Sequence, residues 1–182
     1  MFIAVAVAAG IAIGLLRGGS ITRLGEASFR VWPLLVAGVA VQAAAAFASR
    51  AAVTLIIVSY LVLLVFAGVN YRHVGMGVVF LGIALNLVVI GLNGGMPVRA
   101  DAIVAAGIVD HRSEIAKLDF GSKRHLESPN DKVTWLGDIV PVPLATEVLS
   151  FGDLVMSVGV ADVLVHLLRR KGREGSASPG SD

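Results

Sequence analysis

The sequence predicts an all-α integral membrane protein: a bundle of about five transmembrane helices, with a long extracytoplasmic loop that contains an amphipathic helix. Composition is the first observation behind this prediction. Of the 182 residues, 56% are hydrophobic and 15% are charged, whereas soluble domains average about 45–50% and about 25%. Distribution is the second observation, because the apolar residues gather in runs close to the ~20 residues that cross a bilayer, and the charged residues lie between the runs.

Composition also excludes several classes of function. The chain has no cysteine, which rules out disulfides, thiolate chemistry and cysteine-ligated metals. Its net charge is +2, but the basic residues flank apolar runs, so they indicate membrane topology and not a nucleic-acid partner. His111 and Glu114 have a ligand-like spacing without a second histidine to match, so we expect no metal site. No nucleotide or phosphate fingerprint is present, and we expect no cofactor.

Five apolar runs define the expected membrane domain, residues 1–168. The predicted spans are residues 1–16, 31–48, 51–69, 74–92 and 148–168. The first run lacks the basic residues that precede a cleaved signal peptide, so we interpret it as a retained span. Ser49 and Arg50 alone separate the second and third spans, which predicts a tight antiparallel hairpin. The fourth span contains Gly75, Gly77, Gly82 and Gly91, and small residues of this kind predict close packing against another helix.

Charge placement predicts the topology. Lysine and arginine in the short connections favour an N-terminus outside and a C-terminus in the cytoplasm. The loop of residues 93–147 is then extracytoplasmic, and residues 169–182 form a disordered cytoplasmic tail. Within the loop, apolar positions on one side of a segment from Asp101 to about Leu118 predict an amphipathic helix on the membrane surface or on the bundle.

Four of the polar residues inside the predicted spans are candidates for contacts or chemistry within the membrane. Gln42 and Asn86 share a depth, so we expect a hydrogen bond between them that joins two helices. Asp162 and His166 are four residues apart on one helix face. They are candidates for a proton relay or a cation site, because an acid within a span is costly; the alternative places His166 among lipid headgroups.

Turn formers and acids converge at the outer ends of the spans, which we call the outer mouth. The candidate ligand- or partner-binding residues there are Asn93, Gly94, Gly95, Met96, Pro97, Gly137, Asp138, Ser150, Gly152 and Asp153. Asp138 and Asp153, each preceded by glycine, are the candidate catalytic pair, since two nearby carboxyls can split into an acid and a base. The structural alternative is that Ser150 or Asp153 caps the last helix.

Three motifs in combination resemble the small bacterial multipass membrane proteins grouped as domain of unknown function 5317. They are Asn93-Gly94-Gly95-Met96-Pro97, Leu136-Gly137-Asp138-Ile139 with Pro141 and Pro143, and Ser150-Phe151-Gly152-Asp153. The resemblance covers the chain from the first span to about Leu168. It implies a bacterial plasma-membrane protein whose loop and last helix form one unit, and it transfers no activity and no catalytic residue.

The leading functional hypothesis is a non-enzymatic scaffold, accessory subunit or small-ligand binder that works through the outer mouth. Its expected partners are the lipid bilayer and either other membrane-protein subunits or further copies of the chain. Two alternatives come from other classes. One is an interfacial aspartyl hydrolase that uses Asp138 and Asp153. The other is a proton- or cation-coupled carrier that uses Asp162 and His166.

Overall fold

The computed structural model describes residues 2–25, 28–48, 51–121 and 123–169. Helices dominate it, and the strands and 3-10 helices lie between the fourth and the fifth of the five long helices. The helices are α1 (Phe2–Leu16), α2 (Thr22–Gly25), α3 (Pro33–Ala45), α4 (Ala52–Val69), α5 (Met76–Asn93), α6 (Ala100–Ala105) and α7 (Phe151–Arg169). The strands are β1 (Met96–Val98), β2 (Arg124–Leu126), β3 (Asp138–Val142) and β4 (Glu147–Ser150). Three 3-10 helices, η1 (Arg112–Lys117), η2 (Thr134–Leu136) and η3 (Pro143–Ala145), complete it.

Three of the helices, α4, α5 and α7, are long and apolar enough to cross a membrane. The helices α1 and α3 are apolar but shorter, so their spanning role stays a prediction. Large apolar side chains cover the outward surfaces, including Leu61 and Val65 on α4. Such surfaces are costly in water and suit a hydrocarbon solvent, so the architecture is compatible with a membrane protein.

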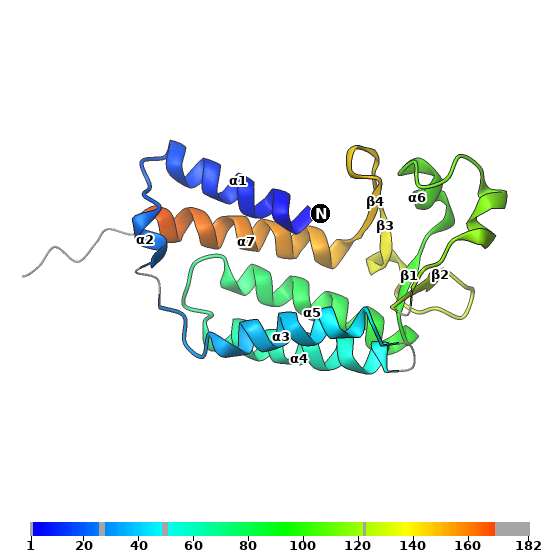
Figure 1. Ribbon diagram of the computed structural model, residues 1–182, viewed down its shortest axis with the longest axis horizontal. Helices are drawn as coiled ribbons and strands as arrows, with labels where there is room; N and C mark the ends of the chain where they lie inside the picture. Colours follow the sequence, from blue (N-terminus) through cyan, green and yellow to red (C-terminus); the bar gives the residue numbers. More distant parts are fainter. Residues whose placement is uncertain (1, 26–27, 49–50, 122, 170–182) are drawn as a thin grey trace, which may run out of the picture.

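The five long helices pack as an open ring. Helix α1 packs on α7, α7 on α5, α5 on α4, and α4 on α3. No contact of comparable extent joins the described residues of α1 to those of α3. Figure 1 shows the result: α1 and α7 lie together on one side, α3 and α4 on the other, and the sheet stands at one end.

Glycines set the close approach of α5 to α7. A Cβ atom on Gly82 would lie 2.5 Å from the backbone nitrogen of Met156, and one on Gly159 would lie 2.5 Å from that of Val79. These distances are too short for a methyl group, so the two backbones touch directly. The sequence prediction is therefore confirmed for Gly82, whereas Gly77 and Gly91 face open space.

A four-stranded sheet occupies the segment for which the sequence predicted only a loop and a helix, so the all-α prediction is wrong in this region. The strand order is β2-β1-β3-β4. Strand β1 pairs in parallel with β2 and β3, and β3 pairs antiparallel with β4. Met96 and Pro97, expected in a turn, lie in β1, and Val148 belongs to β4 and not to the last helix.

The amphipathic helix predicted for residues 101–118 is also corrected. The chain forms the short helix α6, turns at Gly107 with φ +69°, and continues as the 3-10 helix η1. Ile103 and Ile115 are buried in one cluster with Val98 and Val148 of the sheet. The apolar side of this segment therefore packs inward on the sheet, which removes the reason to place it on a lipid surface.

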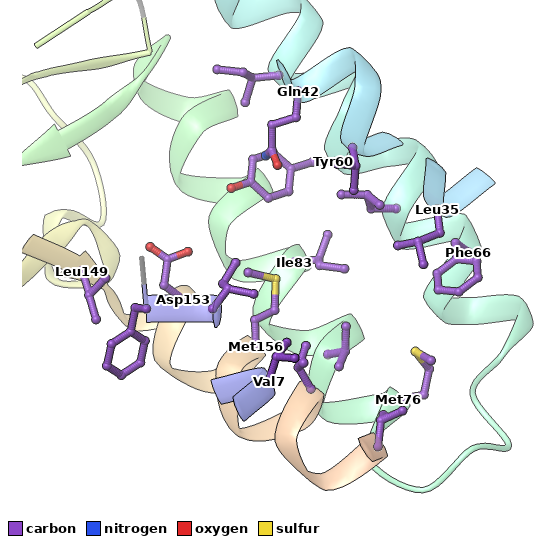
Figure 2. Close-up of a pocket in the computed structure, with 18 of the residues that line it drawn as sticks. Val7, Leu35, Gln42, Tyr60, Phe66, Met76, Ile83, Leu149, Asp153 and Met156 are labelled. Atoms are coloured by element: carbon purple, nitrogen blue, oxygen red, sulfur yellow. The ribbon is translucent and has the colours of Figure 1, made fainter. Parts of the chain in front are cut away.

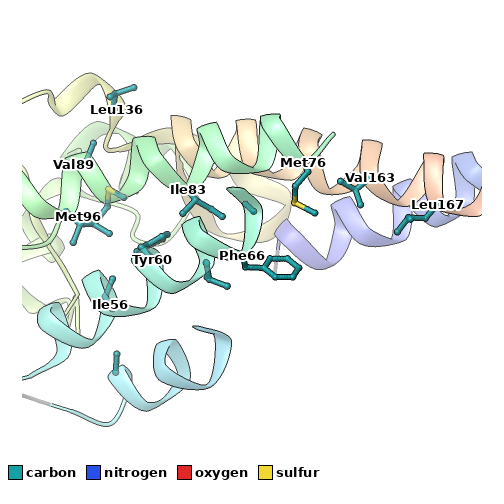
Figure 3. Close-up of a cluster of buried hydrophobic side chains, with 14 residues drawn as sticks. Ile56, Tyr60, Phe66, Met76, Ile83, Val89, Met96, Leu136, Val163 and Leu167 are labelled. Atoms are coloured by element: carbon teal, nitrogen blue, oxygen red, sulfur yellow. The ribbon is translucent and has the colours of Figure 1, made fainter. Parts of the chain in front are cut away.

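The main apolar core lies between α4, α5 and α7. It includes Ile56 and Phe66 of α4, Ile83 and Val89 of α5, and Val163 of α7 (Figure 3). This cluster joins the two sides of the open ring, so it fixes the relative positions of the helices that surround the candidate site. Residues 49 and 50 of the predicted hairpin, and all of the predicted tail except Arg169, lie outside the described residues.

Candidate functional site

A cavity of about 770 Å³ fills the interior of the open ring, a volume within the usual range of ligand pockets. Its wall is mainly apolar and comes from all five long helices, for example Val7, Leu35, Ile83 and Met156 (Figure 2). Polar groups concentrate where the helices meet the sheet. They are Gln42, Tyr60, Lys123, Arg124, Asp138, Glu147 and Asp153.

Asp138 is the most deeply buried acid of this polar end, with 1% of its surface exposed. It begins β3 and pairs with Val98 of β1, while Arg124 of β2 pairs with Met96 on the other side of β1. Residues two apart on a strand share a face, so the sheet brings Arg124 beside Asp138. The Arg124 Nε atom lies 2.8 Å from Oδ2 of Asp138.

The carboxyl of Asp138 has unused hydrogen-bonding capacity. The Arg124 contact is close enough for an ion pair, and neither carboxyl oxygen accepts a hydrogen bond from the described residues. Burial raises the pKa of Asp138 to about 7; the charge of Arg124 opposes this rise and the charge of Asp153 adds to it. Asp138 is therefore a buried acid that titrates near neutral pH.

Asp153 occupies a different environment, within a hydrogen-bonded ring at the start of α7. Its backbone N–H donates to Ser150 Oγ at 3.0 Å, and its Oδ2 accepts from the Ser150 N–H at 3.3 Å. This reciprocal pair is a capping box. Asn86 of α5 closes the ring: its Nδ2 donates to Asp153 Oδ1 at 2.8 Å, and its Oδ1 accepts from Ser150 Oγ at 2.9 Å. The capping interpretation of Ser150 and Asp153 is thus confirmed.

The hydrogen bond expected between Gln42 and Asn86 does not form, because Asn86 bonds to Ser150 and Asp153 instead. Asn86 is fully buried and uses its amide on α7, because Gly152 allows the helix start to come close; a Cβ there would lie 2.1 Å from Asn86 Oδ1. Gln42 instead lies by the Tyr60 hydroxyl, which Asn86 also approaches. Asp153 and Tyr60 face the cavity from opposite walls (Figure 2).

The remaining residues predicted at the outer mouth lie where α5 meets the sheet or in and beside its strands. The Asn93 side chain binds the backbone of Lys132. Its Oδ1 accepts from the Lys132 N–H at 2.7 Å, and its Nδ2 donates to the Lys132 carbonyl at 2.9 Å. Gly94 ends α5 in the left-handed conformation, with φ +66°, as expected of a helix stop. Gly137 approaches β1 so closely that a Cβ would lie 2.6 Å from the carbonyl oxygen of Pro97. These positions shape the mouth and carry no reactive group.

Asp162 and His166 lie apart from this cavity, toward the other end of α7. Their side chains meet, with His166 Nδ1 3.0 Å from Asp162 Oδ1, and both are partly exposed. His166 lines a smaller cavity of about 270 Å³ with Arg72 and His73. The predicted pairing of Asp162 with His166 is confirmed, while a role in transport stays a prediction. Among the described residues, no cluster of three or more histidine, aspartate or glutamate side chains could hold a metal ion.

Sequence reasoning missed Arg124, Lys123 and Tyr60. Tyr60 was detectable, because it is a polar group within an apolar run. The two basic residues gave no local indication, since their place beside Asp138 depends on parallel pairing of strands about 28 residues apart.

A family model described as "Family of unknown function (DUF5317)" matches residues 26–165. The match contains all three motifs on which the resemblance was based and begins after α1. No curated protein and no solved structure matches the chain.

Proposed function

We propose that this chain, which belongs to the DUF5317 family of unknown function, is a membrane-embedded binding protein. It holds a small ligand in the cavity within the helix ring, with the polar part of the ligand at the sheet end. This is the small-ligand form of the hypothesis drawn from the sequence, and it moves the working surface from the rim of the mouth into the cavity below.

One observation supports the proposal above the rest. Asp138 is buried on the cavity wall and, beyond its ion pair with Arg124, accepts no hydrogen bond from the described residues. Buried polar groups in folded proteins nearly always have partners, since an unmet one costs roughly 1–3 kcal/mol. A ligand that donates a hydrogen bond to this carboxyl removes that cost. The apolar wall around it then adds favourable binding free energy, because the ligand buries apolar surface against it.

The hydrolase alternative has one observation in its favour, namely the raised pKa of Asp138 beside the charge of Asp153. An aspartyl pair needs both carboxyls free to exchange protons with one water. Asp153, however, already accepts hydrogen bonds at both oxygens and caps α7. Its carboxylate therefore serves the fold, and binding is the better-supported function.

The test is whether a molecule occupies the cavity in the native membrane. The full chain is purified in mild detergent and analysed by native mass spectrometry. Val39 and Val36 provide matched variants on α3, because both are about half exposed but only Val39 lines the cavity. We expect wild type and Val36→Trp to carry the same added mass and Val39→Trp to lose it.

A wild-type chain without bound mass would overturn the proposal, as would a Val39→Trp variant that retains the mass. Melting temperatures of the three proteins show that the variants are folded. If the purified chain instead comes with a stoichiometric protein subunit and an empty cavity, the accessory-subunit hypothesis replaces the binder.

A further inference from the structure

We infer that the ligand is an aminophospholipid, which enters sideways from the bilayer between α1 and α3 and places its ammonium group on Asp138. This inference rests on the proposed binding function and names the class of ligand. Three features of the described residues lead to it: where the ring is open, which groups stand at the polar end, and what covers the rest of the wall.

The opening of the ring faces the lipid side of the molecule. Helix α1 packs on α7 and α3 packs on α4, with no comparable contact between α1 and α3. Both helices nevertheless line the cavity, and their lining residues Ile3 and Val39 are 46% and 52% exposed. A cavity whose rim is exposed and apolar at the level of the spans admits a molecule from hydrocarbon and not from water.

The polar end selects a head group that donates hydrogen bonds. A carboxylate has only acceptor sites, and both oxygens of Asp138 are unused apart from the Arg124 ion pair. Asp153 is committed to the cap. An ammonium group brings three N–H donors, whereas a quaternary ammonium brings none.

Charges of both signs at this end suit a zwitterionic head group, which carries a phosphate as well as an ammonium group. The cavity wall there holds the carboxyls of Asp138 and Asp153 and the cations Lys123 and Arg124. The ammonium group can pair with the Asp138 carboxyl. Lys123 is exposed and the Arg124 side chain is 41% exposed, so both can reach a phosphate beside the ammonium.

The apolar wall makes a lipid a better occupant than a soluble amine. Side chains such as Phe66, Ile83 and Val163 continue the cavity away from the sheet along three helices. A soluble head group would fill only the polar end and leave this surface uncovered, whereas an acyl chain covers it.

The experiment compares phosphatidylethanolamine with phosphatidylcholine of identical acyl chains, which differ only in whether the nitrogen carries hydrogens or methyl groups. The full chain is delipidated in detergent and titrated with each lipid by native mass spectrometry. We expect wild type to prefer the ethanolamine lipid by roughly tenfold or more, the value of one charge-assisted hydrogen bond. Asp138→Asn loses this preference, and Asp101→Asn, an exposed carboxyl outside the cavity, keeps it.

Lys123→Gln adds a variant at an exposed position that does not disturb folding. It weakens both lipids alike, because both carry a phosphate, and leaves their ratio unchanged. Soluble phosphoethanolamine separates the head group from the lipid, and we expect it to bind at least tenfold more weakly than the intact lipid.

The outcomes separate this inference from the function on which it rests. Equal binding of the two lipids, or a preference that survives Asp138→Asn, overturns the inference. If Val39→Trp still blocks that binding, the cavity is a binding site and the proposed function stands. If Val39→Trp blocks no lipid binding, and the native chain carries no other bound mass, the inference and the proposed function both fail.

Discussion

Replacing Asp138 with asparagine should change how stability depends on pH. The folded carboxyl has a pKa of about 7, against an ordinary value of 3.8. Between these two values the folded chain holds a proton that the unfolded chain has released, so the folded state loses stability as pH rises. The contribution is fully present below about pH 4 and is lost by about pH 7.

The magnitude follows from the difference between the two pKa values. About three pH units at roughly 1.36 kcal/mol each give a loss of about 4 kcal/mol in the free energy of unfolding. For a chain of this size that corresponds to a melting temperature lower by roughly 8–16 °C. Asparagine has nearly the same shape and does not ionise, so Asp138→Asn should lack this loss.

Thermal unfolding in one non-ionic detergent, measured from pH 4 to pH 8, tests the prediction. The quantity of interest is the melting temperature of wild type minus that of Asp138→Asn at each pH. We expect this difference to fall with rising pH and to level off above about pH 7. A flat difference for Asp138→Asn would refute the reasoning, because it would mean that the carboxyl ionises normally.

The other predictions concern the contact between α5 and α7. Gly82→Ala should destabilise the chain by about 1–3 kcal/mol, since the added methyl meets the backbone of α7; Gly91→Ala on the same helix meets nothing and should be neutral or slightly stabilising. Melting temperatures of the two variants in detergent compare them directly, and equal effects would contradict the packing. Asn86→Leu should cost about 1–3 kcal/mol, because Asp153 loses a donor and Ser150 Oγ loses an acceptor. Faster amide hydrogen exchange at the first turn of α7 would report that loss. Unchanged exchange there would show that the hydrogen bonds among Asn86, Ser150 and Asp153 contribute little to stability.

Hydrophobicity predicted the helices well because each one depends on its own residues. Every predicted span contains a helix whose limits differ by a few residues, and Gly82 was correctly expected at a close contact. The pairing of Asp162 with His166 was also predictable, since their spacing on one helix fixes it.

The sheet could not be predicted in the same way because its strands depend on distant partners. Strands β1 and β2 have three residues each and pair in parallel across an intervening helix. Proline and glycine around Met96 suggested a turn, and tertiary pairing overrode that preference. The polar end of the cavity followed the same pattern: Asp138 was identified as a candidate, but its partner Arg124 comes from the strand that local sequence did not reveal.

The order in which the helices are synthesised differs from the order in which they pack. Helix α1 is synthesised before α3, α4 and α5, yet Gly10 and Gly14 on its packing face fit against Ala161 and Leu168 of α7, which follows all three. Until then α1 has no neighbour of comparable contact among the described helices. The packing of α1 is therefore complete only when α7 lies between α1 and α5. A chain that terminates before Phe151 leaves the glycine surfaces of α1 and α5 without their partner helix, so we expect quality-control proteases to remove it.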